Sequence, residues 1–107
     1  MPGASATFHE DTHLLSPETM NLHRTIVSLQ EELEAVDWYR QRANACTDAE
    51  LKAILLHNMR EEIEHASMLL EWLRRNSEDF HKQLQTYLFT TKPILEVKED
   101  QEEDETD

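Results

Sequence analysis

Residues that break helices are scarce in this chain. Its 107 residues include one glycine and three prolines, and none of them interrupts the apolar pattern that follows Pro17. Short strands need frequent turns, and turns are built mainly from glycine, proline and small polar residues. The composition therefore argues against an all-β fold and predicts an all-α protein.

The charge of the chain limits its partners. Twenty-three acidic residues against 10 basic ones give a formal net charge of −13, which argues against nucleic acid and anionic membrane surfaces and favours cations. No apolar run approaches the roughly 18 residues of a membrane span, and the first residues lack the basic and apolar regions of a secretory leader. Because Cys46 is also the only cysteine, we expect a cytoplasmic protein in a reducing compartment.

Charge and periodicity divide the chain into three segments. Residues 96–107 hold eight acidic residues and one lysine and show no apolar period, so we expect a disordered acidic tail there. Residues 1–13 are expected to form a disordered N-terminal arm. The helical domain is expected to cover residues 14–95.

Capping signals predict where the helices of that domain begin. Ser16 followed by Pro17 predicts a first helix that begins at Pro17 and ends near residue 45. Thr47 and Glu50 have the spacing of a capping box, which predicts a second helix from about residue 48 to the Asn-Ser pair at 76 and 77. A cap at Ser77 predicts a short third helix that ends near residue 88.

The connection near residue 47 is too short for anything but an antiparallel hairpin of the first two helices. Each helix of about 28 residues is roughly 42 Å long at 1.5 Å per residue. Two helices that share a single apolar stripe bury little surface, and a single core of this size is marginal. We therefore expect two chains to pair into a four-helix bundle.

Three polar residues interrupt the apolar seam between the predicted helices. Glu32 stands in the middle of an apolar row of the first helix, while Glu62 and His65 take seam positions of the second. Glu32 lies about fifteen residues before the connection and Glu62 about fifteen after it, so both carboxylates are predicted at the same depth of the hairpin. Glu62 and His65 are three residues apart, which places both side chains on one helix face.

One Glu on a helix and a Glu-x-x-His motif on another form half of the ligand set of ferritin-like di-iron carboxylate proteins. Two chains related by a twofold axis would complete the set, which predicts a site across a subunit interface. Oxygen ligands with one imidazole per metal favour iron or manganese over zinc. The alternative is that the three side chains pair with one another, or Glu32 with Arg60, in a protein that only binds metal or only assembles.

Five stretches carry a family resemblance, and they are Glu31–Tyr39, with the sequence EELEAVDWY, Ile54–Asn58, Glu61–Met68, Glu71–Arg75 and Thr86–Thr90. Over about residues 10 to 95 the chain resembles the encapsulated ferritins, which are bacterial and archaeal ferroxidases housed inside encapsulin nanocompartments. The resemblance implies a ferritin-like helical hairpin with a short third helix, a homodimer that completes a four-helix bundle, and a decameric ring of five dimers.

The resemblance also implies a reaction and a metal centre. Glu32, Glu62 and His65 correspond to the catalytic ligands of a di-iron centre at the dimer interface, where Fe(II) is oxidised to Fe(III) by dioxygen. Other divalent cations, such as calcium or zinc, are further occupants of such a site. Anionic oxygen ligands favour this oxidation because they stabilise the higher charge of Fe(III).

Four more residues correspond to positions near that centre in the family. Glu31 and Glu34 match carboxylates of an outer site through which metal enters, and Trp38 and Tyr39 match aromatic residues beside this path. For the two acids the alternative is a solvated acidic helix face, and for the aromatic residues it is ordinary packing.

The encapsulin shell protein is the partner that the resemblance implies, with iron stored in the compartment and this chain located inside it. Family members commonly carry a C-terminal encapsulation peptide, whereas residues 96–107 contain no such motif. The route by which the chain is recruited to a shell is therefore left open.

Overall fold

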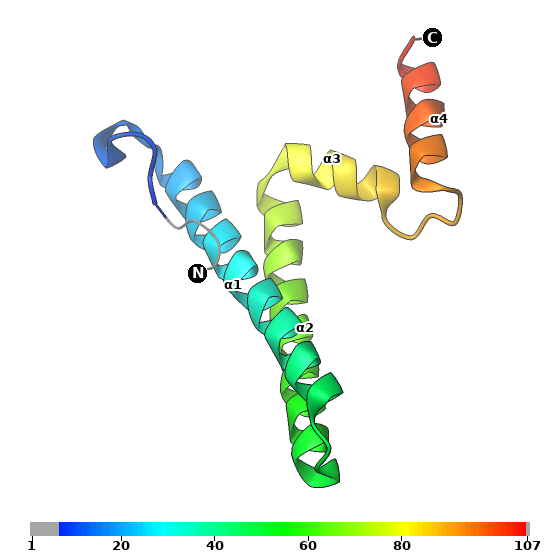
Figure 1. Cartoon of the computed structure of the whole chain (residues 1–107). Helices are drawn as coiled ribbons and strands as arrows, with labels where there is room; N and C mark the ends of the chain where they lie inside the picture. The colour runs from blue at the N-terminus through cyan, green and yellow to red at the C-terminus, as the bar shows by residue number, and fades with distance from the viewer. Residues whose placement is uncertain (1–6, 107) are drawn as a thin grey trace. The chain divides into compact units, whose positions relative to one another are not determined.

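The structure is a computed structural model, and it describes residues 7–106. These residues form a short 3-10 helix and four α-helices and contain no β-strand. The elements are η1 (Thr12–Leu14), α1 (Pro17–Ala45), α2 (Ala49–Asn76), α3 (Glu78–Tyr87) and α4 (Ile94–Thr106) (Figure 1). The prediction of an all-α fold is confirmed.

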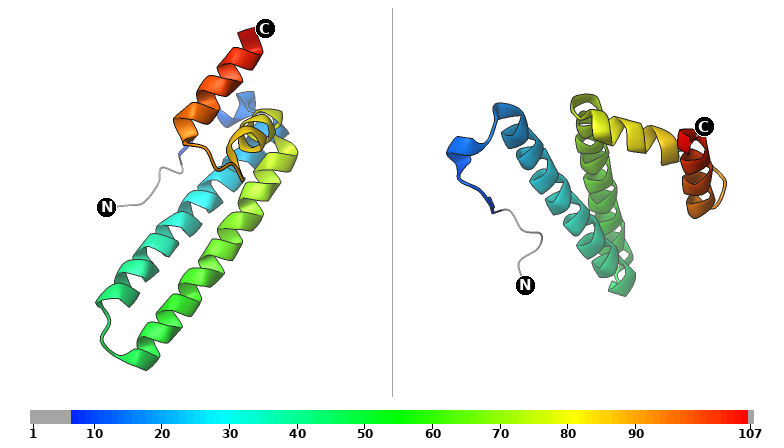
Figure 2. Two further views of the ribbon diagram at one scale, coloured as in Figure 1. Left: turned by 90° about the vertical axis from the view of Figure 1, so that its right-hand side faces the viewer. Right: turned by 90° about the horizontal axis from the view of Figure 1, so that it is seen from above.

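Two compact units make up the chain, and they meet between Trp72 and Leu73. The first unit contains the hairpin of α1 and α2, whose axes run antiparallel and side by side (Figures 1 and 2). The second contains the last residues of α2 together with α3 and α4. None of the helices within residues 7–106 combines the length and low charge that a membrane-crossing segment needs.

Helix α1 begins where its capping residues predict. The Ser16 side chain accepts a hydrogen bond of 3.1 Å from the backbone N–H of Thr19, and Pro17 occupies the first helical position. Proline fits there because that position has no intrahelical N–H bond to lose. The helix continues for 29 residues to Ala45, close to the predicted end.

The cap of α2 differs from the predicted capping box. Asp48, not Thr47, holds the cap, because its carboxylate accepts a 2.8 Å hydrogen bond from the backbone N–H of Leu51. Its backbone carbonyl also accepts the first helical bond, from Lys52. Aspartate caps at least as well as threonine, so two adjacent capping residues compete and the second one prevails.

Replacing Asp48 by alanine is expected to lower the free energy of unfolding by about 1 kcal/mol, because the N–H of Leu51 loses its partner. Thr47→Ala is the matched control and is expected to change the stability by only a few tenths of a kcal/mol, since its side chain is exposed and does not cap. Urea unfolding at one fixed protein concentration measures both. An equal loss of unfolding free energy in the two variants would indicate that Thr47 caps the helix as well.

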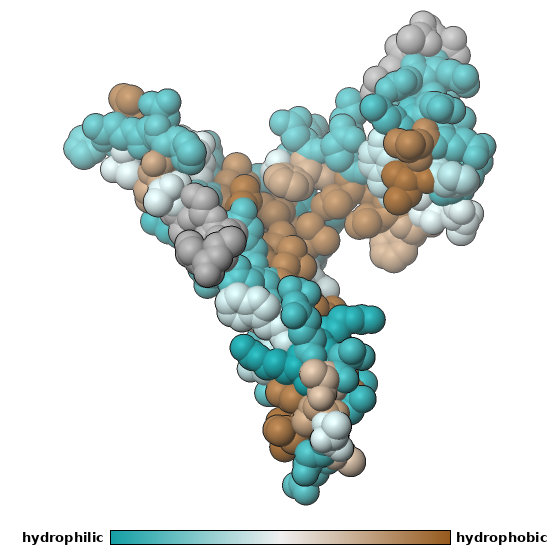
Figure 3. Space-filling view, in the orientation of Figure 1, coloured by the Kyte–Doolittle hydropathy of each residue, from teal (hydrophilic) through white to brown (hydrophobic). Residues whose placement is uncertain are grey.

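Buried residues are few in a single chain. Among residues 7–106 the buried hydrophobic side chains are Ala43, Ala66 and Leu73, and the buried polar one is Thr25. Thr25 satisfies its hydroxyl by donating a 2.9 Å hydrogen bond to the carbonyl of Asn21. Many large apolar side chains of the hairpin stay exposed instead, and they are Leu33, Trp38, Leu51, Ile54, Ile63 and Met68. Figure 3 shows hydrophobic surface along α2.

The N-terminal arm is ordered in its described part. Residues 1–6 lie outside the described residues. Asp11 caps η1 by accepting a 3.0 Å hydrogen bond from the N–H of His13. The ring of Phe8 lies 4.2 Å from that of His23 on α1, measured between centroids. The arm therefore differs from the expected disorder over residues 7–13, because a local cap and an aromatic contact both hold it.

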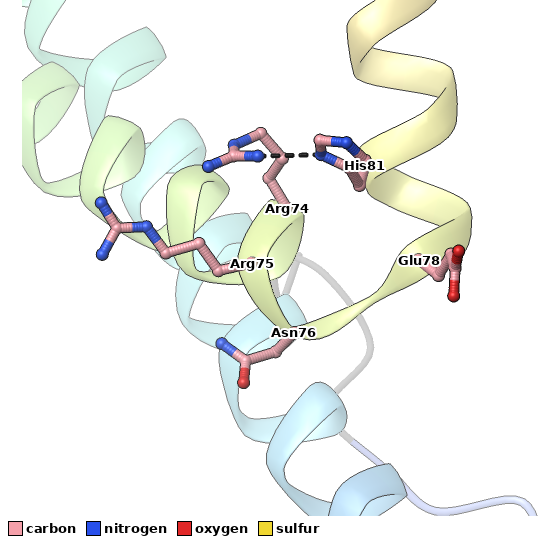
Figure 4. A pocket seen from close by; sticks show the side chains of 5 residues that line it. All are labelled: Arg74, Arg75, Asn76, Glu78 and His81. Carbon is pink, nitrogen blue, oxygen red and sulfur yellow. Dashed lines mark hydrogen bonds between the residues drawn. The ribbon is translucent and has the colours of Figure 1, made fainter.

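Helix α3 begins and ends where the sequence predicts. Ser77 caps it by accepting a 3.3 Å hydrogen bond from the N–H of Phe80. Arg74, near the end of α2, lies 2.8 Å from Nδ1 of His81 on α3 (Figure 4). A guanidinium can only donate, so His81 accepts through Nδ1. A pocket of about 670 Å³ adjoins this pair, and Arg75, Asn76 and Glu78 also line it (Figure 4).

The acidic end of the chain is helical rather than disordered. Pro93 directly precedes α4, and its carbonyl accepts hydrogen bonds from the N–H groups of Glu96 and Val97. The two lysines supply the opposite charges, because Lys92 lies 2.8 Å from Asp100 and Lys98 lies 3.7 Å from Glu102. The hydrogen bond and the charge of Asp100 raise the pKa of Lys92. Residue 107 lies outside the described residues. Over residues 96–106 the structure has a helix where disorder was expected, and the pair of Lys98 and Glu102 has the i, i+4 spacing that supports one.

Candidate metal centre

The polar residues of the seam lie together in the hairpin. Glu32 on α1 and Glu62 and His65 on α2 each offer one ligand atom, and these atoms all lie within 4.8 Å of one another. Nδ1 of His65 is 3.5 Å from a carboxylate oxygen of Glu32 and 3.5 Å from one of Glu62. All three side chains are half-buried.

Helix geometry explains how the chain builds this cluster. The three-residue connection between Ala45 and Ala49 folds α2 back along α1, so residues equally far from it lie at the same depth. Glu32 and Glu62 are such a pair, and the structure has them at one depth. His65 follows Glu62 by three residues and shares its helix face.

The three side chains of the cluster do not satisfy one another by hydrogen bonds. A charged hydrogen bond to a carboxylate is about 2.7 to 2.9 Å long, and both contacts of His65 are longer. The Glu32 oxygen nearest His65 is buried and has no hydrogen-bond donor. A buried acceptor without a donor is destabilising by about 1 to 3 kcal/mol, and by more if charged. The alternative pairing of Glu32 with Arg60 is not formed among residues 7–106.

Two carboxylates and one imidazole suit a divalent transition metal. Hard oxygen ligands with a single nitrogen are the donors that iron and manganese accept, and a cation would satisfy the unpartnered oxygen of Glu32. Within the described residues the cluster brings together three ligand groups, and it lies on a hairpin whose apolar side chains are exposed. The residues present therefore fit a metal ion.

The other predicted residues do not belong to this cluster. Glu31 is exposed and Glu34 half-buried, and neither carboxylate is among the groups that could hold a metal in residues 7–106. Trp38 is exposed. Tyr39 is half-buried, and the guanidinium of Arg42 lies 5.4 Å from its ring centroid, in a cation–π contact.

Gln30 is a polar residue that the sequence did not single out. Its side-chain oxygen is buried and, within the described part of the chain, has no hydrogen-bond partner. It lies four residues after Ile26 and three before Leu33, so a polar residue in an apolar row was the available signal.

The family is decided by comparison with known proteins. A family model described as EncFtn-like matches residues 7–91, which is most of the chain. The chain belongs to the EncFtn-like family. This match includes α1, α2, α3 and all three residues of the Glu32 cluster. The resemblance to encapsulated ferritins is thereby confirmed.

Relatives within the EncFtn-like family are similar over nearly the whole chain. An encapsulated ferritin-like protein of Rhodospirillum rubrum is 56% identical over 98 residues, which are 92% of this chain and 70% of the relative. A ferritin-like protein of Thermotoga maritima is 48% identical over 93 residues, 87% of this chain and 82% of that protein.

A solved structure supports the EncFtn-like fold. The crystal structure of protein ne0167 from Nitrosomonas europaea matches with a TM-score of 0.77 and 63% sequence identity. The match covers 81% of this chain and 96% of that one. The predicted ferritin-like, all-α fold of the single chain is confirmed by this likeness together with the helices described above.

Proposed function

We propose that this protein is a ferroxidase, which oxidises Fe(II) to Fe(III) with dioxygen at a di-iron site shared by two chains. Glu32, Glu62 and His65 of each chain would hold the iron. The observation that carries the proposal is the buried oxygen of Glu32, which has no hydrogen-bond donor, within a cluster of two carboxylates and one imidazole.

Pairing of two chains would double the ligands. A twofold axis brings the same surface of both chains together, so that four carboxylates and two imidazoles would surround two iron ions, as in ferritin-like bundles. The exposed side chains of Leu33 and Ile63, which directly follow Glu32 and Glu62 in sequence, supply apolar surface for such an interface. Burial of this surface would also stabilise the fold, because the single chain has few buried apolar side chains.

Iron is the substrate in this reaction. Each Fe(II) loses one electron, and dioxygen accepts the electrons together with protons, two for hydrogen peroxide or four for two waters. The carboxylates of Glu32 and Glu62 stabilise the higher charge of the Fe(III) product. A neutral His65 imidazole would bind through the lone pair of its unprotonated ring nitrogen.

Neighbouring residues are given supporting roles. Glu31 and Glu34 on α1 would form an outer site that attracts Fe(II), consistent with the negative charge of the chain. Trp38 and Tyr39 would line the approach to the centre, with Tyr39 held by the cation–π contact to Arg42.

The assembly proposed is a ring of five such dimers inside an encapsulin nanocompartment of the cytoplasm, with the shell storing the oxidised iron. The relative from Rhodospirillum rubrum is named an encapsulated ferritin-like protein, which supports the shell as partner.

Aerobic Fe(II) oxidation tests the function directly. Absorbance of Fe(III) and uptake of oxygen are followed together, with the protein at several concentrations and with protein-free buffer as reference. A rate well above the buffer supports the proposal, and a rate per chain that rises with concentration supports a shared site. Uptake of metal without consumption of oxygen would instead identify a metal-binding protein without turnover, and no uptake at all would identify a structural module.

A further inference from the structure

A pocket lies at the corner where α2 ends and α3 begins. Its volume is about 670 Å³, and the described residues that line it are all polar, namely Arg74, Arg75, Asn76, Glu78 and His81 (Figure 4). These residues belong to the second compact unit and lie outside the Glu32 cluster. Ligand sites have volumes of roughly 300 to 1,000 Å³ and are mostly apolar, so a polar lining at this volume calls for a polar ligand.

Most of the side chains around the pocket donate hydrogen bonds. Arg74 and His81 point toward each other (Figure 4), and the guanidinium donates to Nδ1 at 2.8 Å. A neutral His81 therefore carries its proton on Nε2, as a further donor. Each guanidinium has five N–H donors in a planar fork and can serve several acceptors at once, and Asn76 adds an amide NH₂. Such a set of donors matches the oxygens of an oxyanion.

The charge of the pocket lining differs from that of the whole chain. Two arginines and one glutamate line the pocket, whereas the chain has 23 acidic and 10 basic residues. Arg74 and Arg75 are also the only basic residues that are adjacent in sequence. The N-terminus of α3, at Glu78, adds the partial positive charge of a helix dipole. An anion is thus favoured locally on a protein that otherwise repels anions.

We propose that this pocket binds inorganic phosphate. Glu78 is the acceptor among the donors, and it selects an anion that carries an O–H group. Hydrogen phosphate and dihydrogen phosphate carry one near neutral pH, so one oxygen can donate to Glu78 while the others accept from the arginines. Sulfate has no such proton at neutral pH, and a phosphate monoester, with a second pKa of about 6, has lost most of it. The site needs no metal and goes beyond the ferroxidase proposal, on which it does not rest.

The alternative is that these charges only complement the two helix dipoles. Arg74 and Arg75 lie in the last turn of α2, and Glu78 and Asp79 lie in the first turn of α3, where each sign is favourable. In that case the arginines would stabilise the fold but would bind no anion. The two roles differ in whether phosphate binds saturably and in which variants lose that binding.

Equilibrium dialysis of the full chain against orthophosphate, in iron-free buffer at constant ionic strength, tests the site. Saturable binding of one phosphate per chain is expected. Arg74→Gln and Arg75→Gln are each expected to weaken it by about tenfold or more, because each removes charged donors to the anion. Arg75 is exposed, so that variant is expected to fold. Lys82→Gln is the matched control, since it removes the same charge from an exposed position of α3 outside the pocket.

Competition identifies the anion. Sulfate and adenosine monophosphate are expected to displace phosphate about tenfold less effectively than phosphate itself, and Glu78→Ala is expected to remove this preference. The proposal is overturned by the absence of saturable binding, by unchanged binding in both arginine variants, or by an equal loss in Lys82→Gln. Equally effective displacement by sulfate or by the monoester would overturn it as well. Because iron is absent, each result is independent of whether the protein oxidises Fe(II).

Discussion

Replacing Glu32 or His65 by alanine is expected to reduce the rate of aerobic Fe(II) oxidation by more than about a hundredfold, toward that of protein-free buffer. Changes to groups that merely support metal ligands lower metal affinity or activity by roughly 10- to 100-fold, and these two residues are proposed as ligands themselves. Each substitution removes two ligands from a site shared by two chains. Absorbance of Fe(III), with oxygen uptake, measures the loss.

The matched control is Glu50→Ala. It also removes one carboxylate, from the exposed first turn of α2, and is expected to keep the full rate of Fe(II) oxidation.

The free energy of unfolding, measured without metal, distinguishes a residue that binds metal from one that stabilises the fold. Because the buried Glu32 oxygen has no donor, the metal-free Glu32→Ala chain is expected to be at least as stable as the unchanged one. A marked loss of metal-free stability, or an unchanged oxidation rate, would contradict the assignment.

The double change Leu33→Asn with Ile63→Asn is expected to leave the chains monomeric at concentrations where the unchanged protein pairs. Both side chains are exposed in the single chain, and burial of each is worth about 1.5 to 3 kcal/mol at an interface. Removal of both is therefore expected to weaken pairing by more than about a hundredfold. Native mass spectrometry measures it, and Fe(II) oxidation is expected to fall with the fraction of pairs.

Leu14→Asn serves as the control for this prediction, since Leu14 is exposed on η1 rather than on the hairpin. Recovery of the oxidation rate at high protein concentration would show that the double variant still folds. Full activity of a chain that stays monomeric would contradict a site shared between subunits.

Local signals in the sequence predicted some elements well. Ser16, followed by Pro17, is an isolated cap, so the start of α1 had one candidate. At the start of α2 two capping residues are adjacent, and local preference alone did not separate Thr47 from Asp48. Helix α4 was not expected because net charge takes no account of the i, i+4 spacing of Lys98 and Glu102.

The sequence predicted those parts of the candidate centre that follow from helix geometry alone. The i, i+3 spacing of Glu62 and His65, and the equal distance of Glu32 and Glu62 from the connection, follow from helix periodicity. The unpartnered oxygens of Gln30 and Glu32 depend on which donors the neighbouring helix brings near them. Such information arises only when the helices pack.

Scarcity of buried side chains has a thermodynamic consequence. With Ala43, Ala66 and Leu73 as the buried hydrophobic residues of the described chain, little apolar surface opposes the conformational entropy gained on unfolding. If two chains pair as proposed, pairing adds to the stability of the folded form by mass action. The midpoint temperature of thermal unfolding is accordingly expected to rise with protein concentration, as in obligate dimers.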